Sequence, residues 1–183
     1  VSAASVEFHA DAVVALAAHL EVSLDADNLL ENYGDSWEGH LAACYSPVAN
    51  SSLAPLWSPL VVISSNASVG VGGGGATFDV VLARLRPGTR YEVTLYARMQ
   101  GAGEELKAVW KGPFTSKTTG YPRFDEGAFV TMIGEAPSFE MATFAIMGDQ
   151  VMGTKDKDFY GLVAIDAEGY VVWCYHMLFL ESW

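Results

Sequence analysis

The residues that could perform chemistry in this 183-residue chain are few and lie far apart. A metal or catalytic centre needs several such side chains together. Glu38-Gly39-His40 offers two metal ligands without a third in sequence. Lys155-Asp156-Lys157-Asp158 compensates its own charges and lacks the glycine and distal glutamate of a calcium loop. We therefore predict solvated loops at both places, with no bound metal or cofactor.

Two further patterns could bind an anion. The glycine run from Gly72 to Gly75 could aim backbone amides at a phosphate. However, Ala76-Thr77-Phe78-Asp79 follows it, where a phosphate-binding loop has Lys-Ser or Lys-Thr, so we predict a loop before a strand. Arg84, Arg86 and Arg90 surround a Pro-Gly pair and could hold sulfate. Exposed arginines that balance an acidic surface are the favoured interpretation.

Nucleophilic catalysis has no local signature in this chain. The sequence contains no Gly-x-Ser-x-Gly elbow and no cysteine-histidine motif with a recognised spacing. His176 follows a Val-Val-Trp run, and a lone histidine at the end of a strand is more often structural or exposed than catalytic. The sequence therefore predicts no catalytic residue.

Two cysteines and two sequons bear on the compartment. Cys44 and Cys174 are too few for a disulfide framework or a zinc site, so they form either one bridge or two buried free thiols. The sequons at Asn50 and Asn66 both lie in loop-like sequence rich in serine, glycine and proline, where a glycan has room. The two sequons together favour a secreted or cell-surface glycoprotein.

Composition and charge exclude several classes of protein. With 51% hydrophobic and 17% charged residues, the chain is too apolar for a disordered protein and can bury a core. Its formal net charge of −12 repels nucleic acid and anionic membrane surfaces. No apolar run reaches the about 20 residues that a membrane-spanning helix needs. Because the chain begins at Val1 without methionine or a signal-like segment, we expect a processed or trimmed product.

Alternating hydrophobic residues predict strands in the first part of the chain. The even positions from Val14 to Leu24 are apolar, whereas the odd positions include His19 and Glu21, which is the two-residue period of a strand. A polar loop is expected from Asp25 to Gly39, with a short helical turn at Leu29 to Tyr33. Further strands are expected at residues 40–45 and 60–64.

The strongest local pattern is a corner between two strands around Pro87-Gly88. The Pro-Gly pair predicts a turn, and from Tyr91 onward every second residue is apolar, which places these side chains on one face of a strand. The spacing of Leu85, Pro87, Thr89 and Tyr91 resembles that of the fibronectin type III family at this corner. This resemblance implies a fibronectin type III-like β-sandwich over residues 1–118.

The end of that sandwich is predicted from turn residues. A closing strand is expected from Leu106 to Lys111, and Gly112-Pro113 then predicts a turn before Phe114-Thr115. Glycine and proline in Thr118 to Pro122 predict a linker. We therefore predict a second domain over residues 119–183.

The second domain contains three candidate strand regions. Phe129 to Ile133 and Phe139 to Met147 are two of them, and Gly161 to Tyr175 predicts a hairpin. In its turn, Asp166 caps the loop and Gly169 supplies a positive φ angle. The hairpin resembles the opening propeller blade of arylsulfotransferase-like proteins, a family that places a small β-sandwich before its propeller.

That resemblance implies an incomplete propeller. A closed propeller needs at least about four blades of about 40 residues each, and residues 119–183 are too few for this. In the family a channel histidine in a later blade accepts the sulfuryl group, and no residue here matches it. We therefore expect an all-β chain, with a fibronectin type III-like sandwich followed by an incomplete propeller-like antiparallel segment.

An apolar stretch at the end of the chain predicts an interface. An incomplete propeller cannot cover such a stretch by itself, and large exposed apolar patches mark interaction sites. The residues concerned are Trp173, Met177, Leu178, Phe179, Leu180 and Trp183. The expected partner is protein, either the downstream part of a longer chain or another subunit in a homo-oligomer or filament.

These observations lead to two expectations about function. The first is a non-catalytic binding or assembly module of a secreted or cell-surface arylsulfotransferase-like glycoprotein. The alternative is a fragment of an active aryl sulfotransferase whose catalytic histidine lies in later, absent propeller blades.

Overall fold

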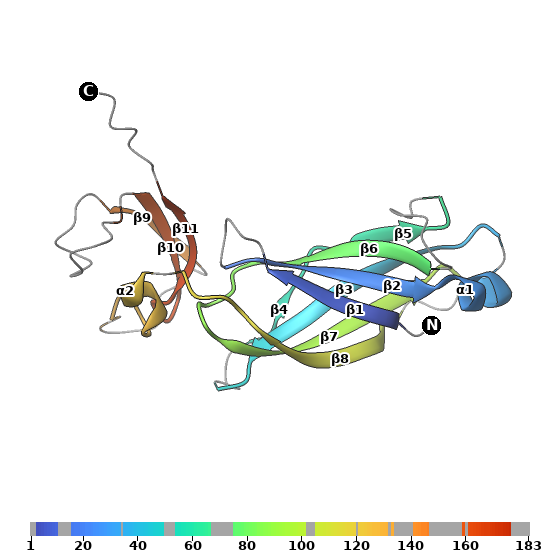
Figure 1. Ribbon diagram of the computed structural model, residues 1–183, viewed down its shortest axis with the longest axis horizontal. Helices are drawn as coiled ribbons and strands as arrows, with labels where there is room; N and C mark the ends of the chain where they lie inside the picture. The colour runs from blue at the N-terminus through green and yellow to red at the C-terminus, as the bar shows by residue number, and fades with distance from the viewer. Residues whose placement is uncertain are drawn as a thin grey trace, which may run out of the picture. The chain divides into compact units, whose positions relative to one another are not determined.

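The computed structural model describes residues 3–10, 16–33, 35–49, 54–66, 75–101, 105–119, 121–131, 133, 141–146, 159 and 161–176 (Figure 1). They form eleven strands and two short helices: β1 Ala3–Ala10, β2 Ala18–Asp25, α1 Ala26–Tyr33, β3 Glu38–Pro47, β4 Leu56–Trp57, β5 Val61–Ser64, β6 Gly75–Leu82, β7 Arg90–Met99, β8 Lys107–Thr115, α2 Pro122–Asp125, β9 Met141–Ile146, β10 Gly161–Asp166 and β11 Val171–His176. All strand pairs among these residues are antiparallel. The predicted all-β class is therefore confirmed.

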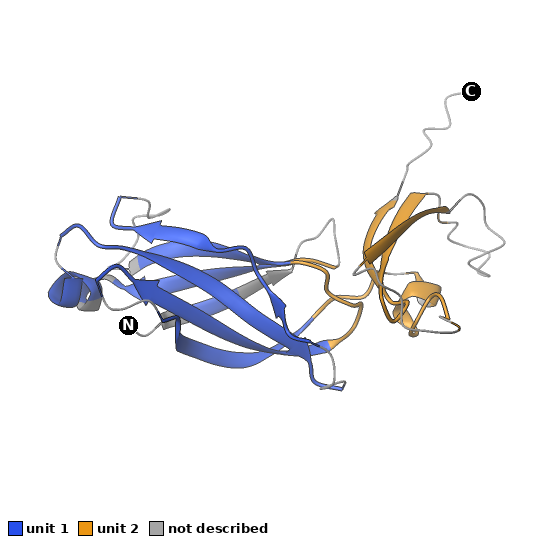
Figure 2. Ribbon diagram, turned by 180° about the vertical axis from the view of Figure 1, so that it is seen from behind, with its two compact units in different colours: residues 1–10, 18–82, 90–115 blue, residues 11–17, 83–89, 116–183 orange. Residues whose placement is uncertain are grey.

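The chain divides into two compact units, which Figure 2 colours separately. The first unit contains residues 1–10, 18–82 and 90–115, and the second contains residues 11–17, 83–89 and 116–183. Residues 11–17 and 83–89 lie inside the range predicted for the first domain, so the second unit is built from three separate parts of the chain.

Two antiparallel sheets make up the first unit. The smaller sheet has the strand order β1-β2-β6, and the larger has the order β4-β3-β7-β8, with β5 also pairing β3. Along the chain, helix α1 connects β2 of the smaller sheet to β3 of the larger one. The short strands β4 and β5 come between β3 and β6, where the chain returns to the smaller sheet. The chain changes sheet after β2, β5 and β6, so the pairs β2–β6 and β3–β7 join distant parts of the sequence.

Strand β2 shows the predicted alternation. Leu20, Val22 and Leu24 are fully buried, whereas Glu21 and Asp25 are exposed. Alternate residues of a strand point to opposite faces of the sheet, so the apolar set forms the core side. The prediction of a strand from residue 14 is wrong at its start, because β2 begins at Ala18 and Leu16 lies in a turn; residues 11–15 lie outside the described part.

The closing strand corrects a prediction. Gly112-Pro113 makes no turn, because β8 runs without interruption from Lys107 to Thr115, and Gly112 and Pro113 pair with Val93 and Glu92 of β7. Strand β8 ends the order of the larger sheet and pairs there with β7 alone. An edge strand tolerates proline, since the missing amide does not have to donate to a second neighbour.

Aromatic residues fill the core of the first unit. The rings of Trp37 and Phe78 pack edge to face with centroids 6.1 Å apart, and Tyr45 and Tyr91 do the same at 6.1 Å. All four side chains are buried. Edge-to-face packing of this kind adds to the gain from burying apolar area. Tyr91 of the predicted corner therefore belongs to this core.

The second unit contains a three-stranded sheet with the order β11-β10-β9. Strands β10 and β11 form the hairpin expected at Gly161 to Tyr175, and β9 lies within the expected Phe139 to Met147. The strand predicted at Phe129 to Ile133 is wrong for its described residues: Phe129 and Val130 form a bend, and residues 131 and 133 lie in no regular element. Its backbone instead lies on the hairpin turn, where the amides of Phe129 and Val130 both donate to the carbonyl of Gly169 at 2.8 and 3.2 Å.

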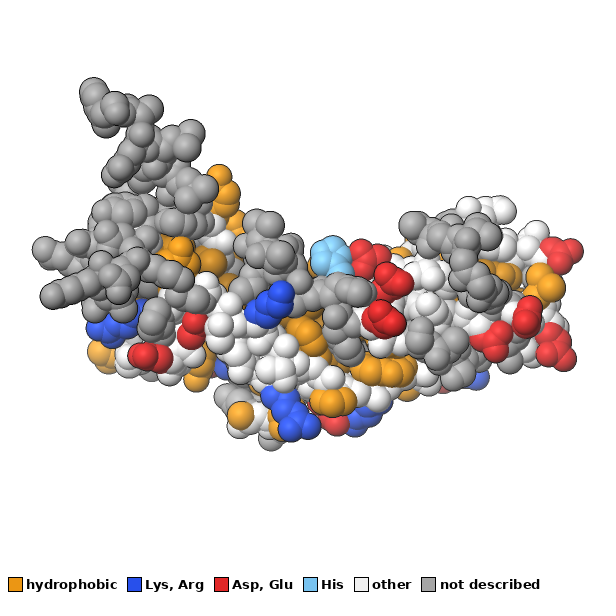
Figure 3. Space-filling view, viewed as in Figure 1, with side chains coloured by type: hydrophobic (Ala, Val, Ile, Leu, Met, Phe, Trp, Pro, Cys, Tyr) orange, Lys and Arg blue, Asp and Glu red, His pale blue; other side chains and the backbone are white. Residues whose placement is uncertain are grey.

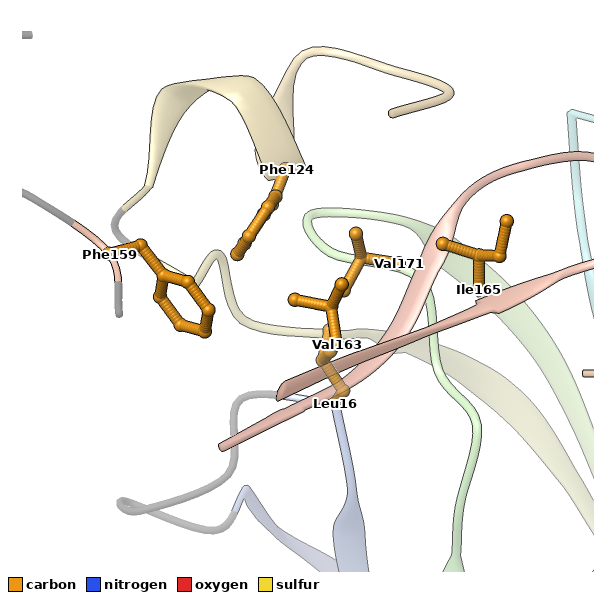
Figure 4. Packing of buried hydrophobic residues seen from close by; sticks show 6 residues of the cluster. All are labelled: Leu16, Phe124, Phe159, Val163, Ile165 and Val171. Carbon is orange, nitrogen blue, oxygen red and sulfur yellow. The ribbon is translucent and has the colours of Figure 1, made fainter. Parts of the chain in front are cut away.

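The core of the second unit gathers residues from two of its three parts, residues 11–17 and 116–183. Leu16, Phe124, Phe159, Val163, Ile165 and Val171 pack together in it (Figure 4). The ring centroid of Phe124 lies 5.1 Å from those of Phe129 and Phe159. Leu16 continues the alternation that leads into β2, yet it is buried in this second core. Local periodicity cannot tell which of two cores an apolar side chain enters.

Candidate functional site

Arg86 joins the Pro-Gly corner to the hairpin turn within the second unit. Its Nε donates to Oδ2 of Asp166 at 2.6 Å, and its Nη2 donates to Oε2 of Glu168 at 2.7 Å. Its Cζ lies 3.9 Å from the ring centroid of Tyr170. Two charge-assisted hydrogen bonds and a cation–π contact thus fix one guanidinium on one turn.

This arrangement corrects the interpretation of Arg86 as an exposed arginine. The residue is only 6% exposed, and its positive charge faces two carboxylates. Breaking a buried ion pair on one side leaves an uncompensated charge in a poorly solvated place. Arg86 is therefore a structural residue and is not placed to hold sulfate.

The corner itself is held by Ser116. The amide of Thr89 donates to Oγ of Ser116 at 2.9 Å, and that hydroxyl donates to the carbonyl of Arg86. The Thr89 hydroxyl donates to the carbonyl of Pro87 at 2.9 Å, and Leu85 is fully buried. These contacts explain why the spacing of residues at this corner is distinctive, and they give it a structural role.

The hairpin turn uses both of the residues singled out in the sequence. Oδ1 of Asp166 accepts hydrogen bonds from the amides of Glu168 and Tyr170 at 3.1 and 3.0 Å. Gly169 has a φ of 86°, in the left-handed region that favours glycine. A Cβ at Gly169 would also lie 1.9 Å from the carbonyl oxygen of Val130, so no side chain fits there.

The strongest candidate for function is the face of the three-stranded sheet that points away from the core. Strand register places one set of side chains on it, here called the uncharged face: Thr143, Ala145, Leu162, Ala164, Trp173 and Tyr175. None of these six carries a charge; the same register also places Met141 and Asp166 on this face, at the turn end, where Asp166 is paired with Arg86. The opposite face contributes Val163, Ile165 and Val171 to the core. This sheet is therefore apolar on both faces.

Two aromatic rings dominate the uncharged face. Trp173 and Tyr175 stack with ring centroids 6.4 Å apart and an interplanar angle of 11°. Their side chains are 38% and 56% exposed. A sheet that is apolar on both sides is normally covered on both sides, so such rings are suited to burial against another protein surface.

Sequence reasoning found only part of this face. It selected Trp173, whereas Tyr175, Leu162 and Ala164 were missed, and Met177, Leu178, Phe179, Leu180 and Trp183 lie outside the described residues. The signal was present in the first arm of the hairpin. Leu162 to Ile165 is an unbroken apolar run, which is typical of a strand that is covered on both faces.

The two cysteines are free thiols. Burial raises the pKa of Cys44, and burial followed by the nearby charge of Asp125 raises the pKa of Cys174. A raised pKa lowers the fraction of reactive thiolate. Neither thiol is therefore activated for nucleophilic chemistry.

The remaining predicted positions are scattered. Asn66 lies exposed in a turn after β5, whereas Asn50, Asp156 and Asp158 lie outside the described residues. Among the residues that the structure describes, no three His, Cys, Asp or Glu side chains are grouped to hold a metal ion. No helix in the same residues is long and apolar enough to cross a membrane.

Comparison with known proteins identifies no relative. No family model, no curated protein and no solved structure matches this chain.

Proposed function

We propose that this chain is a non-catalytic binding or assembly module that associates through the uncharged face of its second unit. The observation that supports it is the pair of stacked, exposed rings of Trp173 and Tyr175 on a sheet that is apolar on both faces. Burial of such rings stabilises a protein–protein contact more than most other side chains do.

We also propose that the first unit is a fibronectin type III-like sandwich. In an immunoglobulin-like sandwich, strands A, B and E share one sheet and strands C, F and G share the other. In chain order β1, β2 and β6 occupy the first set of positions and β3, β7 and β8 the second. This order supports a fibronectin type III-like sandwich for the first unit.

A propeller-like origin is proposed for the second unit. Its strands β9, β10 and β11 pair with their neighbours in chain order, as the strands of a propeller blade do. Blades stack face to face, which agrees with a sheet that is apolar on both sides. We propose a second copy of the chain as the partner, in a secreted or cell-surface glycoprotein that resembles the arylsulfotransferase-like proteins.

Sedimentation velocity of the full chain over a range of concentrations tests the association. The wild type is expected to form a dimer or larger species, and Trp173→Ser/Tyr175→Ser is expected to sediment as a monomer. Trp57→Ser is the matched control, because Trp57 is similarly exposed, at 51%, but belongs to the first unit. A wild type that remains monomeric at its highest soluble concentration would contradict the proposal.

A further inference from the structure

The outer face of the larger sheet in the first unit carries a second aromatic pair, of which Trp57 is exposed and Tyr96 is half-buried. Trp57 of β4 lies opposite Cys44 of β3, and Tyr96 of β7 lies opposite Ala42 of β3. The two ring centroids are 5.3 Å apart with an interplanar angle of 39°. Trp57 is 51% exposed. We call these two rings the aromatic platform.

Small side chains surround the aromatic platform. Ala42 and Cys44 lie beside the rings on β3, Thr94 precedes Tyr96 by one same-face position on β7, and Ala108 lies opposite Tyr96 on β8. None of these side chains is large enough to rise above an indole. Trp57 therefore stays half-exposed beside Tyr96, with the two rings tilted by 39° to one another.

A cavity that is open to solvent and lined by both polar and apolar side chains lies along the same strands. It has a volume of about 400 Å³, and its polar lining consists of Glu38, His40, Arg98 and Gln100. Arg98 occupies the next same-face position after Tyr96 and pairs with His40. Same-face neighbours on a strand are about 7 Å apart, so Arg98 places one side of the cavity beside Tyr96.

Hydrogen bonds hold the cavity in shape. Nη2 of Arg98 lies 3.4 Å from Nδ1 of His40, and because a guanidinium only donates, the imidazole nitrogen accepts. The amide of Gln100 donates to the carbonyl of Glu38 at 2.8 Å. A Cβ at Gly39 would lie 2.6 Å from the carbonyl oxygen of Arg98, so the two strands approach closely here.

The combination of platform and cavity matches one chemical class of ligand. A sugar ring has an apolar face of C–H groups that packs on an indole or phenol, and a rim of hydroxyls that both donate and accept hydrogen bonds. Glu38 offers acceptors, Arg98 offers donors and Gln100 offers both. The net charge of −12 opposes a polyanion and leaves a neutral ligand unaffected.

From this geometry we infer that the outer face of the larger sheet is a binding site for a neutral oligosaccharide, with Trp57 and Tyr96 stacking on sugar rings and the cavity binding hydroxyls. The site lies in the first unit and does not depend on the uncharged face of the second. The failure of either proposal therefore leaves the other intact.

Affinity electrophoresis of the full chain tests the inference. Native gels would each contain one soluble polysaccharide: a β-glucan, a xylan, a galactomannan, an α-glucan or, as the anionic comparison, alginate. We expect retardation in at least one neutral gel, and a dissociation constant at least about tenfold weaker for Trp57→Ala and for Tyr96→Ala, a loss of about 1.4 kcal/mol. Trp57→Phe should retain part of the binding, and Leu30→Ala should bind like the wild type, because Leu30 is also 51% exposed but lies on helix α1.

Several outcomes would overturn the inference. The site is excluded if the wild type migrates in every neutral gel as it does in a gel without polysaccharide. It is also excluded if Trp57→Ala and Tyr96→Ala keep the circular dichroism of the wild type and are still retarded as strongly. Retardation in alginate alone would show attraction between charges and not stacking. Loss of self-association by Trp57→Ser in sedimentation would show that this face contacts protein.

Discussion

The two three-stranded sheets of this protein share an antiparallel plan but differ in their outer faces. In the first unit, Glu7, Glu21 and Asp79 stand in one row across β1, β2 and β6. Figure 3 shows acidic side chains and a histidine gathered over this sheet. In the second unit the corresponding row is Trp173, Ala164 and Thr143. The first sheet presents charged side chains to water on one side, whereas the second presents an exposed tryptophan beside small uncharged side chains.

The same difference appears in the polar side-chain pairs of the two units. On the first sheet, Nδ1 of His19 lies 2.8 Å from Oδ2 of Asp79, and these side chains are 41% and 60% exposed. In the second unit, the side chains of Arg86 and Asp166 are 8% and 13% exposed. Solvent screens the first pair more than the second, so contacts of similar length have unequal energetic consequences.

Substituting one partner of each pair tests this difference, and we expect the greatest loss of stability at Arg86. Arg86→Met should destabilise the second unit by about 3–5 kcal/mol, because Asp166 and Glu168 lose their shared partner. Asp79→Asn is the control and should change stability by less than about 1 kcal/mol. Urea unfolding followed by circular dichroism and tryptophan fluorescence measures both. Equal effects of the two substitutions would show that Arg86 is solvated.

Glycine positions allow a second test of how tightly each unit is packed. Gly169 and Gly101 have φ angles of 86° and 85°, but a Cβ meets the Val130 carbonyl at Gly169 and nothing within 4 Å at Gly101. Gly101→Ala should cost about 1 kcal/mol through backbone strain alone. Gly169→Ala should cost clearly more. Thermal unfolding of the two variants compares them, and identical losses would contradict the close approach of Val130.

The two thiols give the smallest expected effect. Burial, with Asp125 as the second cause, raises the pKa of Cys174 above its ordinary value of 9.0, so the folded state holds the thiol proton more tightly than the unfolded state does. The resulting stabilisation is present below pH 9 and is lost as the pH rises through the folded pKa. Iodoacetamide at pH 8 should therefore alkylate Cys174 more slowly than a thiol in an unfolded peptide.

Asp125→Asn provides the control for this test. This substitution removes the negative charge that helps to raise the pKa of Cys174, so Cys174 should be alkylated faster. The alkylation rate of Cys44 should not change, because burial alone raises its pKa. Mass spectrometry of the two cysteine peptides measures the rates. A Cys174 that reacts as fast as an unfolded thiol would contradict the burial of its side chain.

Local chemistry in the sequence determined the strands and turns that depend on near neighbours. The alternation in β2 and β7 is read from successive residues, and Asp166 and Gly169 define their turn because the bonds and the φ angle involve residues at most four positions apart. The aromatic and apolar character of Trp173 was likewise visible, because side-chain type does not depend on the fold.

Tertiary structure alone decided which partners those residues meet. The sequence did not predict β1, it assigned a turn to Gly112-Pro113 within β8, and it placed Leu16 in the strand that follows it. Arg86 and Asp166 are 80 positions apart, and Trp57 and Tyr96 come from strands that both pair with β3. Such contacts form because folding buries whole faces of the sheets. The residues on one face come from distant parts of the sequence, so a local pattern does not show which of them will meet.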